Sequence, residues 1–508
     1  MDYQLLFSRF AADAAHARWP RQRQLHEGLR QAIRQGTLGS GVRLPASRTL
    51  AQELGVSRNT VLYAYNQLAT EGFVRPDTRG TVVAPALGAS TAPGAKPPRH
   101  PSHPSSTRHV HPTPALHAHL SRRALSVPTY EQGSVDAATA FTPGVPALQE
   151  FPLTLWRRLL ERAWRNMRKP QLNYADPQGE TPLREAIANH LRVARGALLD
   201  SSQVFITDGT QHSLDIVAHA FADAGDKVWI ESPGYLGALA AFKGAQLKPM
   251  GMVVDAQGIA PSAADWQRHR PRLVYVTPSH QFPTGTVLSL ERRLALIAQA
   301  RAAGSLLIED DYDSEFRHDG PPLSCMQGLA PDAPVIYLGT FSKTLFPALR
   351  IGFMVVPASL VAPLRELLSR SAPRGRVAEQ WALAEFMHSG QFSLHLRRMR
   401  RLYRQRRDAL VTELERQLGD MGGVADVFGG SAGMHLALRL RDPQADDVAM
   451  SRWLRQHGLV AQALSEHAMG QRVQPWRGFV LGYAQVPAEQ MANKVGLLAQ
   501  AIQTFTPE

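Results

Sequence analysis

A lysine and an aspartate, 33 residues apart, are the side chains on which the chemistry of this sequence depends. Lys343 is one of only seven lysines in 508 residues, and it lies in the segment Gly339-TFSKTLFPALRIG. Asp310 lies in the run Ile308-EDDYDSEF, and both segments read as apolar strands that end in polar groups. Pyridoxal 5'-phosphate requires an amine that can lose its proton and a carboxylate against its pyridine nitrogen. We therefore predict that Lys343 carries this cofactor as an aldimine and that Asp310 keeps the ring nitrogen protonated.

Two tyrosines complete the predicted surroundings of the cofactor ring. Residues two apart on a strand share a face, so Tyr312 is expected to point the same way as Asp310, whereas Asp311 is not. The Tyr312 hydroxyl is then placed to donate a hydrogen bond to the phenolic oxygen of the ring. Tyr235, in Ser232-PGYLG after another predicted strand, is the aromatic residue best placed to stack on the ring.

The phosphate group needs backbone amides at a helix start, together with a cation and hydroxyl groups. Gly209, Thr210 and Gln211 open a predicted helix directly after a strand, which makes an anion site. Ser342 and Arg350 add a hydroxyl and a guanidinium from the lysine segment. Each residue alone has an ordinary alternative, such as half of a salt bridge for Arg350. Together they favour a cofactor site.

Short β-branched runs alternate with amphipathic helices from about residue 140 onward. This alternation predicts an α/β domain over residues 140–505 on a mainly parallel sheet, with a smaller α/β lobe at about 390–505. Six runs fit strands: Val204-FIT, Lys227-VWIES, Arg272-LVYVT, Ser305-LLIED, Val335-IYLG and Ile351-GFMVV. Helices are expected at 181–195 and 289–303. The arginine-rich run at 397–407 is interpreted as the charged outer face of a further helix.

The first part of the chain reads as a DNA-binding domain over residues 17–84. Residues 1–84 hold eleven arginines against six acidic residues. Val61, Ala64, Tyr65 and Leu68 recur at helical spacing and form a core stripe, so the opposite face of that helix is free to enter a major groove. The residues expected to contact double-stranded DNA are Arg48, Ser57, Arg58, Asn59, Thr60, Tyr63 and, at the tip of a two-stranded wing, Arg79. A helical bundle that contacts proteins is the alternative.

Residues 85–135 are predicted to form an extended linker that is rich in Pro, Ser and His. Six histidines between His100 and His119 suggest metal binding, but a mobile segment enforces no ligand geometry, so a solvated linker is favoured.

Bulk composition limits the remaining classes of protein. A length of 508 residues with 44% apolar content predicts two or three domains, and the net charge of +13 favours a polyanionic partner. No apolar run approaches the roughly 20 residues that span a bilayer, and the opening residues do not form a signal peptide. Cys325 is the only cysteine, which excludes an internal disulfide. We therefore expect a cytoplasmic protein without a membrane segment.

The motifs of both parts resemble one family. GVRLPASRTLAQELGVSRNTVLYAYNQLATEGFV resembles the winged helix-turn-helix of GntR regulators, although Ala46 stands where a capping Ser is usual and Thr78 where a Gly is common. Thr277-PSHQFPTG and the two segments around Asp310 and Lys343 resemble fold-type I aminotransferases, and specifically the MocR subfamily. The resemblance implies a homodimeric transcriptional regulator that senses an amino compound or a vitamin B6 metabolite. An active aminotransferase with a DNA-binding head, and a regulator with a vestigial cofactor site, are the alternatives.

The sequence departs from the GABA-sensing members of this subfamily at the effector pocket. Those members hold the ligand carboxylate with two arginines, one of them just after the stacking tyrosine. Here Leu236 and Gly237 follow Tyr235, and His467 lies near the expected place of the second arginine. Arg472 and Arg477 remain as substitutes. The departures disfavour GABA as the effector.

Overall fold

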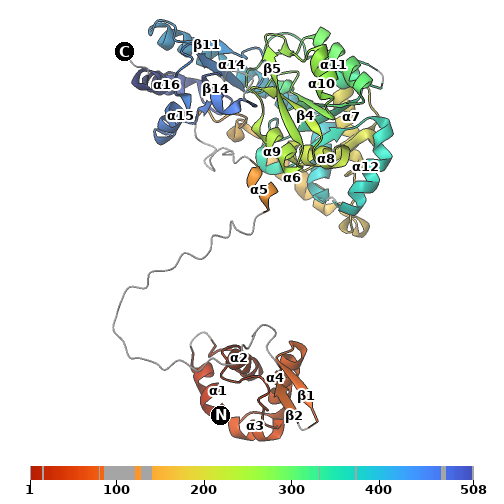
Figure 1. Ribbon diagram of the computed structural model, residues 1–508, viewed down its shortest axis with the longest axis vertical. Coiled ribbons are helices and arrows are strands. Elements are labelled where there is room, and N and C mark those ends of the chain that lie inside the picture. Colours follow the sequence, from red (N-terminus) through yellow and green to blue (C-terminus); the bar gives the residue numbers. More distant parts are fainter. Residues whose placement is uncertain are drawn as a thin grey trace. The chain divides into compact units, whose positions relative to one another are not determined.

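The computed structural model describes residues 2–13, 16–78, 80–84, 121–127, 140–330, 332–371, 375–470 and 476–505. The chain divides into two compact units, residues 1–111 and 112–508. Figure 1 shows the two units, and each has its own hydrophobic core.

The first unit is a small helical domain with a two-stranded wing. Its elements are α1 (Tyr3–Ala12), α2 (Arg21–Arg34), α3 (Ser47–Leu54), α4 (Arg58–Thr70), β1 (Val74–Asp77) and β2 (Gly80–Val83). The strands pair antiparallel, with Val74 opposite Val83. Helix α1 lies before residue 17, and its Tyr3 and Phe7 are buried in the same core as Leu25 and Leu68. The described part of this domain therefore extends further toward the N-terminus than the sequence pattern indicates.

Local signals in the sequence explain how α3 and α4 are placed. Gly55 ends α3 in the left-handed conformation, with φ of 62°. The Ser57 hydroxyl accepts a hydrogen bond from the Thr60 amide at 3.1 Å and so caps α4. Ala46 provides no side-chain cap to α3, as the sequence predicts. The turn and the cap together fix the angle between the two helices.

The second unit is built on an eight-stranded sheet in the order β3-β10-β9-β8-β7-β4-β5-β6. The strands are β3 (Val204–Thr207), β4 (Lys227–Ser232), β5 (Lys248–Asp255), β6 (Gly258–Ile259), β7 (Leu273–Val276), β8 (Leu306–Asp311), β9 (Val335–Thr340) and β10 (Gly352–Val355). The central neighbours β5, β4, β7, β8 and β9 pair in parallel, whereas β10 runs antiparallel to both β3 and β9. The predicted α/β class and mainly parallel sheet are confirmed; β5 and β6 were not predicted.

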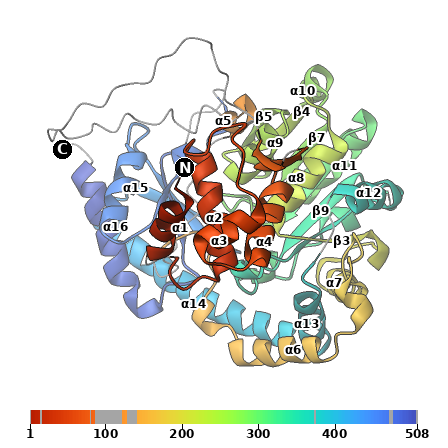
Figure 2. The same ribbon diagram turned by 90° about the horizontal axis from the view of Figure 1, so that it is seen from below.

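Helices cover both faces of this sheet (Figure 2). They are α6 (Leu153–Arg165), α7 (Thr181–Arg195), α8 (Thr210–Phe221), α9 (Leu236–Gly244), α10 (Ala263–His269), α11 (Leu290–Ala303), α12 (Ala358–Ser371) and α13 (Val377–His388). Ile230 and Ile308 pack with α8 and α9, while Trp229 and Leu307 pack with α10 and α11. Successive strand residues thus face opposite layers. A short helix, α5 (Arg122–Ser126), packs against α9 within the stretch predicted as linker.

The smaller lobe follows the long helix α14 (Gln391–Gly419). Its sheet has the order β11-β12-β14-β13, and its elements are β11 (Ala425–Phe428), β12 (His435–Leu440), α15 (Asp447–Gln456), β13 (Gln462–Ala463), β14 (Gly478–Gly482) and α16 (Met491–Phe505).

Helix α14 differs from its interpretation as a charged outer face. Arg397, Arg398 and Arg401 are exposed, but other arginines of the run donate to backbone carbonyl oxygens. Arg400 donates to Glu315 O at 2.6 Å in the large domain, and Arg407 donates to Gly430 O at 2.8 Å in the small lobe. The helix therefore ties the two lobes together.

Candidate functional site

Lys343 lies in the turn between β9 and β10, with its amine held by the backbone. The Nζ atom donates a hydrogen bond to Gly144 O at 2.9 Å, and a Cβ atom at Gly144 would approach Nζ to 2.6 Å. Gly144, with φ of 72°, therefore gives the amine its room. Burial lowers the pKa of Lys343, and the carboxylates of Asp313 and Asp310 act in the opposite direction. The amine thus loses its proton more readily than an exposed lysine does.

Asp310 near the end of β8 is buried and only partly satisfied. Its Oδ2 atom accepts a hydrogen bond from the Tyr275 hydroxyl at 2.7 Å, and its Oδ1 atom has no hydrogen-bond partner among the described residues. Burial raises the pKa of Asp310 to about 7, although the hydrogen bond from Tyr275 lowers it. A buried carboxylate oxygen without a partner is where a protonated ring nitrogen would fit.

The adjacent acid points to the opposite face of the sheet. Asp311 pairs with Arg195 at 2.7 Å and accepts a hydrogen bond from the Tyr337 hydroxyl at 2.7 Å. Asp311 therefore belongs to an internal structural ion pair, whereas Asp310, together with Asp313, acts electrostatically on Lys343.

Tyr312 and Tyr235 both border an aromatic cluster centred on Phe282. Ring centroids of Tyr235, Tyr312, His435 and His467 lie 5.3–6.2 Å from the centroid of Phe282. The structure thus brings the two predicted tyrosines together around one ring.

The Tyr312 hydroxyl is engaged within the protein. It donates to His280 O at 2.9 Å and lies 3.1 Å from His280 Nδ1. Its bond to a cofactor oxygen stays a prediction.

Four of the five predicted phosphate residues, Gly209, Thr210, Gln211 and Arg350, lie together at the start of α8. Gly209 precedes the helix with φ of 97°, and no side chain caps the first amides. A Cβ atom at Gly209 would lie 3.6 Å from the Arg350 guanidinium, so glycine keeps the space between amides and guanidinium open. Thr210 and Gln211 form the first turn, and Ser342 is half-buried in the lysine segment. The charge and the open amides suit an anion.

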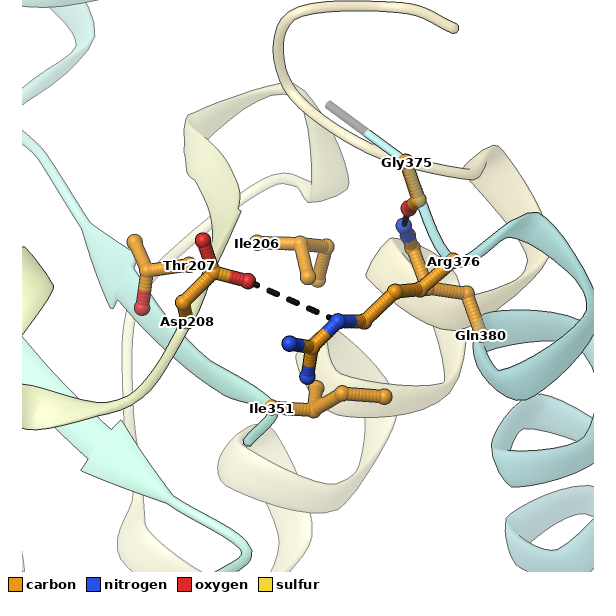
Figure 3. A pocket seen from close by; sticks show the side chains of 7 residues that line it. All are labelled: Ile206, Thr207, Asp208, Ile351, Gly375, Arg376 and Gln380. Atoms are coloured by element: carbon orange, nitrogen blue, oxygen red, sulfur yellow. Dashed lines mark hydrogen bonds and ion pairs between the residues drawn. The ribbon is translucent and has the colours of Figure 1, made fainter. Parts of the chain in front are cut away.

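A small pocket adjoins this helix start (Figure 3). It is lined by Ile206, Thr207, Asp208, Ile351, Gly375, Arg376 and Gln380. Arg376 points toward Asp208 at 3.9 Å and donates to the Leu349 and Arg350 carbonyl oxygens at 2.9 and 3.0 Å. These bonds hold the turn that carries Arg350 against the end of β3, where Gly209 follows.

The sequence reasoning missed several residues of the site. Tyr275 and Gly144 contact Asp310 and Lys343, and His280 contacts Tyr312. Tyr275 carried a usable signal because β7 was predicted and neighbouring parallel strands share an edge. Gly144 lies 199 residues from Lys343, and no local pattern indicates that contact.

The substitutes considered for the effector carboxylate take other roles or lie outside the described residues. Arg477 pairs with the buried Asp447 at 3.4 Å. His467 is buried, with its Nδ1 atom 3.1 Å from Gly234 O, and burial lowers its pKa to about 4. Arg472 is outside the described part of the chain. None of these described groups offers a free cation.

The predicted DNA-contacting residues gather on α3 and α4. Arg48, Ser57, Arg58, Asn59 and Tyr63 are exposed, and Thr60 is half-buried. Arg58 Nε donates to the Ser47 hydroxyl at 3.4 Å, which joins the first turns of the two helices. The core residues of α4 face inward, as the spacing predicts. Arg79 lies outside the described residues.

Family models match both units. The model for "Bacterial regulatory proteins, gntR family" matches residues 21–83, and that for "Aminotransferase class I and II" matches residues 146–490. The "Probable rhizopine catabolism regulatory protein MocR" of Rhizobium meliloti is 37% identical over 95% of this chain and 94% of its own length. The "HTH-type pyridoxine biosynthesis transcriptional regulator PdxR" of Corynebacterium glutamicum is 33% identical over 91% of each chain.

Solved structures resemble the second unit. The Pyrococcus horikoshii kynurenine aminotransferase has a TM-score of 0.68 at 24% identity, over 78% of this chain and 99% of that chain. LysN, the alpha-aminoadipate aminotransferase of Thermus thermophilus, complexed with N-(5'-phosphopyridoxyl)-L-leucine, has a TM-score of 0.66 at 26% identity, over 76% of this chain and 97% of that chain. Within the described residues, no helix is both long and apolar enough to cross a bilayer.

Proposed function

This chain belongs to the MocR-type transcriptional regulators, which join a GntR-type DNA-binding domain to a class I and II aminotransferase domain, and on that premise we propose that it senses an amine through pyridoxal phosphate held at Lys343. The effector is an amino compound or a vitamin B6 metabolite. The protein acts in the cytoplasm on double-stranded operator DNA.

The observation that carries the cofactor proposal is the unpaired Oδ1 atom of Asp310. A buried carboxylate oxygen without a partner is unfavourable in a protein that works without a ligand. A protonated ring nitrogen at Oδ1 would satisfy it, while Tyr275 continues to hold Oδ2. Asp310 thus keeps the proton on the ring, and Lys343 supplies the amine from Gly144.

The remaining residues orient the cofactor. The amides of Gly209, Thr210 and Gln211, with Ser342 and Arg350, hold the phosphate, and Tyr235 covers the ring. Tyr312 turns its hydroxyl from His280 to the phenolic oxygen. Bound pyridoxal phosphate supplies an aldehyde with which an amine can react, so an effector amine competes with Lys343 for it.

The effector acts on DNA binding through the two lobes. Helix α14 holds both lobes by its arginines, so a shift of one lobe changes the other. Coupling requires that the effector bind the two arrangements with different affinity.

We also propose a homodimer for the second unit. Leu153, Trp164, Leu172 and Tyr174 are 57–88% exposed on α6 and the segment after it. A row of large exposed apolar side chains favours an interface between copies of the chain.

The test is Lys343→Ala in the full-length protein. We expect the absorption band that arises from the linkage between the cofactor and the Lys343 amine to disappear. The affinity for operator DNA in the absence of effector should stay unchanged. Lys494→Ala on α16 is the control and should keep the band. A band that persists in Lys343→Ala would contradict the lysine assignment.

Incubation with amino donors and keto acids separates the alternatives. Sustained production of a new keto acid would favour an aminotransferase with a DNA-binding head. Absence of the band in the unsubstituted protein, with pyridoxal phosphate in excess, would favour a vestigial cofactor site.

A further inference from the structure

A second polar cluster lies beside Lys343, at the junction of the two lobes. His280 lies in the loop after β7, Asp313 follows β8, and His435 begins β12 in the small lobe. Each is 1% exposed. One side-chain N or O atom from each lies within 4.8 Å of those from the other two. His280 contacts Tyr312 and Asp313 acts on Lys343, but none of the three residues is proposed above to contact the cofactor.

The contacts of the two imidazoles limit which nitrogen atoms can carry hydrogen. His280 Nε2 lies 3.4 Å from Gly429 O, and His435 Nε2 lies 3.2 Å from Pro283 O. A ring nitrogen that faces a carbonyl oxygen donates to it, so a neutral His435 carries its lone pair on Nδ1. A neutral His280 has one hydrogen for two acceptors, Gly429 O at Nε2 and Asp313 Oδ2 at Nδ1. With the His280 hydrogen on Nε2, both rings have a lone pair on Nδ1 for a metal. His280 Nδ1 also lies 3.1 Å from the Tyr312 hydroxyl, which donates its hydrogen to His280 O.

With the His280 hydrogen on Nε2, the contact between His280 and Asp313 leaves two acceptors facing each other. His280 Nδ1 lies 3.1 Å from Asp313 Oδ2, and both atoms are buried. A lone pair against a carboxylate oxygen is unfavourable in a buried site unless a cation or an additional proton lies at the pair.

The backbone leaves room beside these donors. A Cβ atom at Gly433, with φ of 81°, would lie 2.3 Å from His280 Nδ1 and 2.5 Å from Asp313 Oδ2. Any other residue at this position would fill the space between the two atoms. Gly433 belongs to the segment before β12, so the small lobe supplies both the space and the third donor.

We propose that His280, Asp313 and His435 bind a divalent transition-metal ion that bridges the large domain and the small lobe. Two imidazoles and one carboxylate suit Zn²⁺, Co²⁺ or Ni²⁺, whereas Ca²⁺ and Mg²⁺ prefer oxygen ligands. The Gly429 and Pro283 carbonyl oxygens orient the rings as outer partners of ligating histidines do. Three protein ligands leave a coordination position open.

The competing interpretation is a proton instead of a metal. His280 with hydrogen on both nitrogens would satisfy Gly429 O and form an ion pair with Asp313. In that case the cluster is a structural contact, and it binds no metal.

The experiment is a titration of the metal-free, full-length protein with Zn²⁺. The linker histidines are replaced by Ser so that they cannot contribute to metal binding; they are His100, His103, His109, His111, His117 and His119. We expect one Zn²⁺ per chain. We expect His435→Asn and Asp313→Asn each to weaken its binding by at least about tenfold, since loss of even an outer partner does so.

His467→Asn is the matched control. His467 is also buried and also contacts Phe282, but it is outside the cluster, so its variant should bind Zn²⁺ like the unsubstituted protein. Absence of Zn²⁺ binding once the linker histidines are gone would overturn the proposal, as would unchanged binding in both His435→Asn and Asp313→Asn.

X-ray absorption spectroscopy of the Zn²⁺-loaded protein covers the case in which the variants fail to fold. We expect a signal from two imidazole ligands in the linker-substituted protein. A zinc environment without imidazole would overturn the proposal. Neither measurement depends on pyridoxal phosphate or DNA, so the outcome is independent of the proposed sensing function.

Discussion

Neighbouring acids on β8 should respond in opposite ways to the same substitution in the cofactor-free protein. Asp310 is buried with Oδ1 unpaired, whereas Asp311 is buried against the Arg195 guanidinium at 2.7 Å. We expect Asp310→Asn to stabilise the cofactor-free protein and Asp311→Asn to destabilise it. The two variants differ by one position and carry the same change in charge.

The magnitude for Asp310 follows from its pKa. A carboxyl whose pKa is held at about 7, against an ordinary value of 3.8, costs the folded protein about 4 kcal/mol when fully ionised at pH 8. The Asn amide would place an unpaired N–H in place of Oδ1, at a cost of about 1–3 kcal/mol. The net gain is then about 2 kcal/mol.

The pH dependence has a definite sign. The penalty on Asp310 is absent below the unfolded pKa, grows as the pH rises, and is complete above about pH 7. At pH 5 the folded carboxyl is largely protonated, so the gain from Asp310→Asn should fall to about zero.

The loss of stability expected for Asp311→Asn has a different cause. It leaves Arg195 buried and unpaired and should cost about 3–5 kcal/mol.

Urea unfolding of the full-length protein, followed by tryptophan fluorescence at pH 8 and pH 5, measures these differences. With pyridoxal phosphate added, the unsubstituted protein should become more stable than Asp310→Asn. The Asp310 carboxylate can form an ion pair with the protonated ring nitrogen, whereas the Asn amide cannot. Loss of stability in cofactor-free Asp310→Asn at pH 8 would refute the reasoning, and so would a gain that is equal at both pH values.

Two further predictions concern the DNA-binding helix and the long helix α14. Arg58→Ala should weaken operator binding. It should also lower the slope of log affinity against log salt concentration by about 1, because one phosphate contact is lost. An unchanged affinity in a gel-shift titration would count against α4 as the helix that reads the DNA. Arg404→Ala removes the donor to His318 O and should lower the free energy of unfolding by about 1–2 kcal/mol. Arg401 is also exposed on α14 but makes no such bond among the described residues, so Arg401→Ala should change this free energy by less than about 0.5 kcal/mol. Equal effects of the two substitutions in chemical denaturation would show that the bond from Arg404 to His318 O does not stabilise the fold.

Local pattern was sufficient for part of the site. The two-residue period of a strand placed Asp310 and Asp311 on opposite faces, and the structure has Asp310 against Tyr275 and Asp311 against Arg195. The glycine stop and the serine cap likewise indicated the α3–α4 turn, with Gly55 at φ of 62°. These features depend on neighbours within a few residues, so the sequence alone determines them.

Only the tertiary structure decided which distant groups complete the site. Gly144 holds Lys343 across 199 residues, and His435 comes from a lobe that folds back onto the loop after β7. The contacts of Arg400 and Arg407 on α14 could not be predicted from the sequence either. Their acceptors are backbone carbonyl oxygens, which every residue has, so no residue type marks them. Such contacts arise when separate elements are packed against one another, and side-chain periodicity reports only which face is buried, not what lies against it.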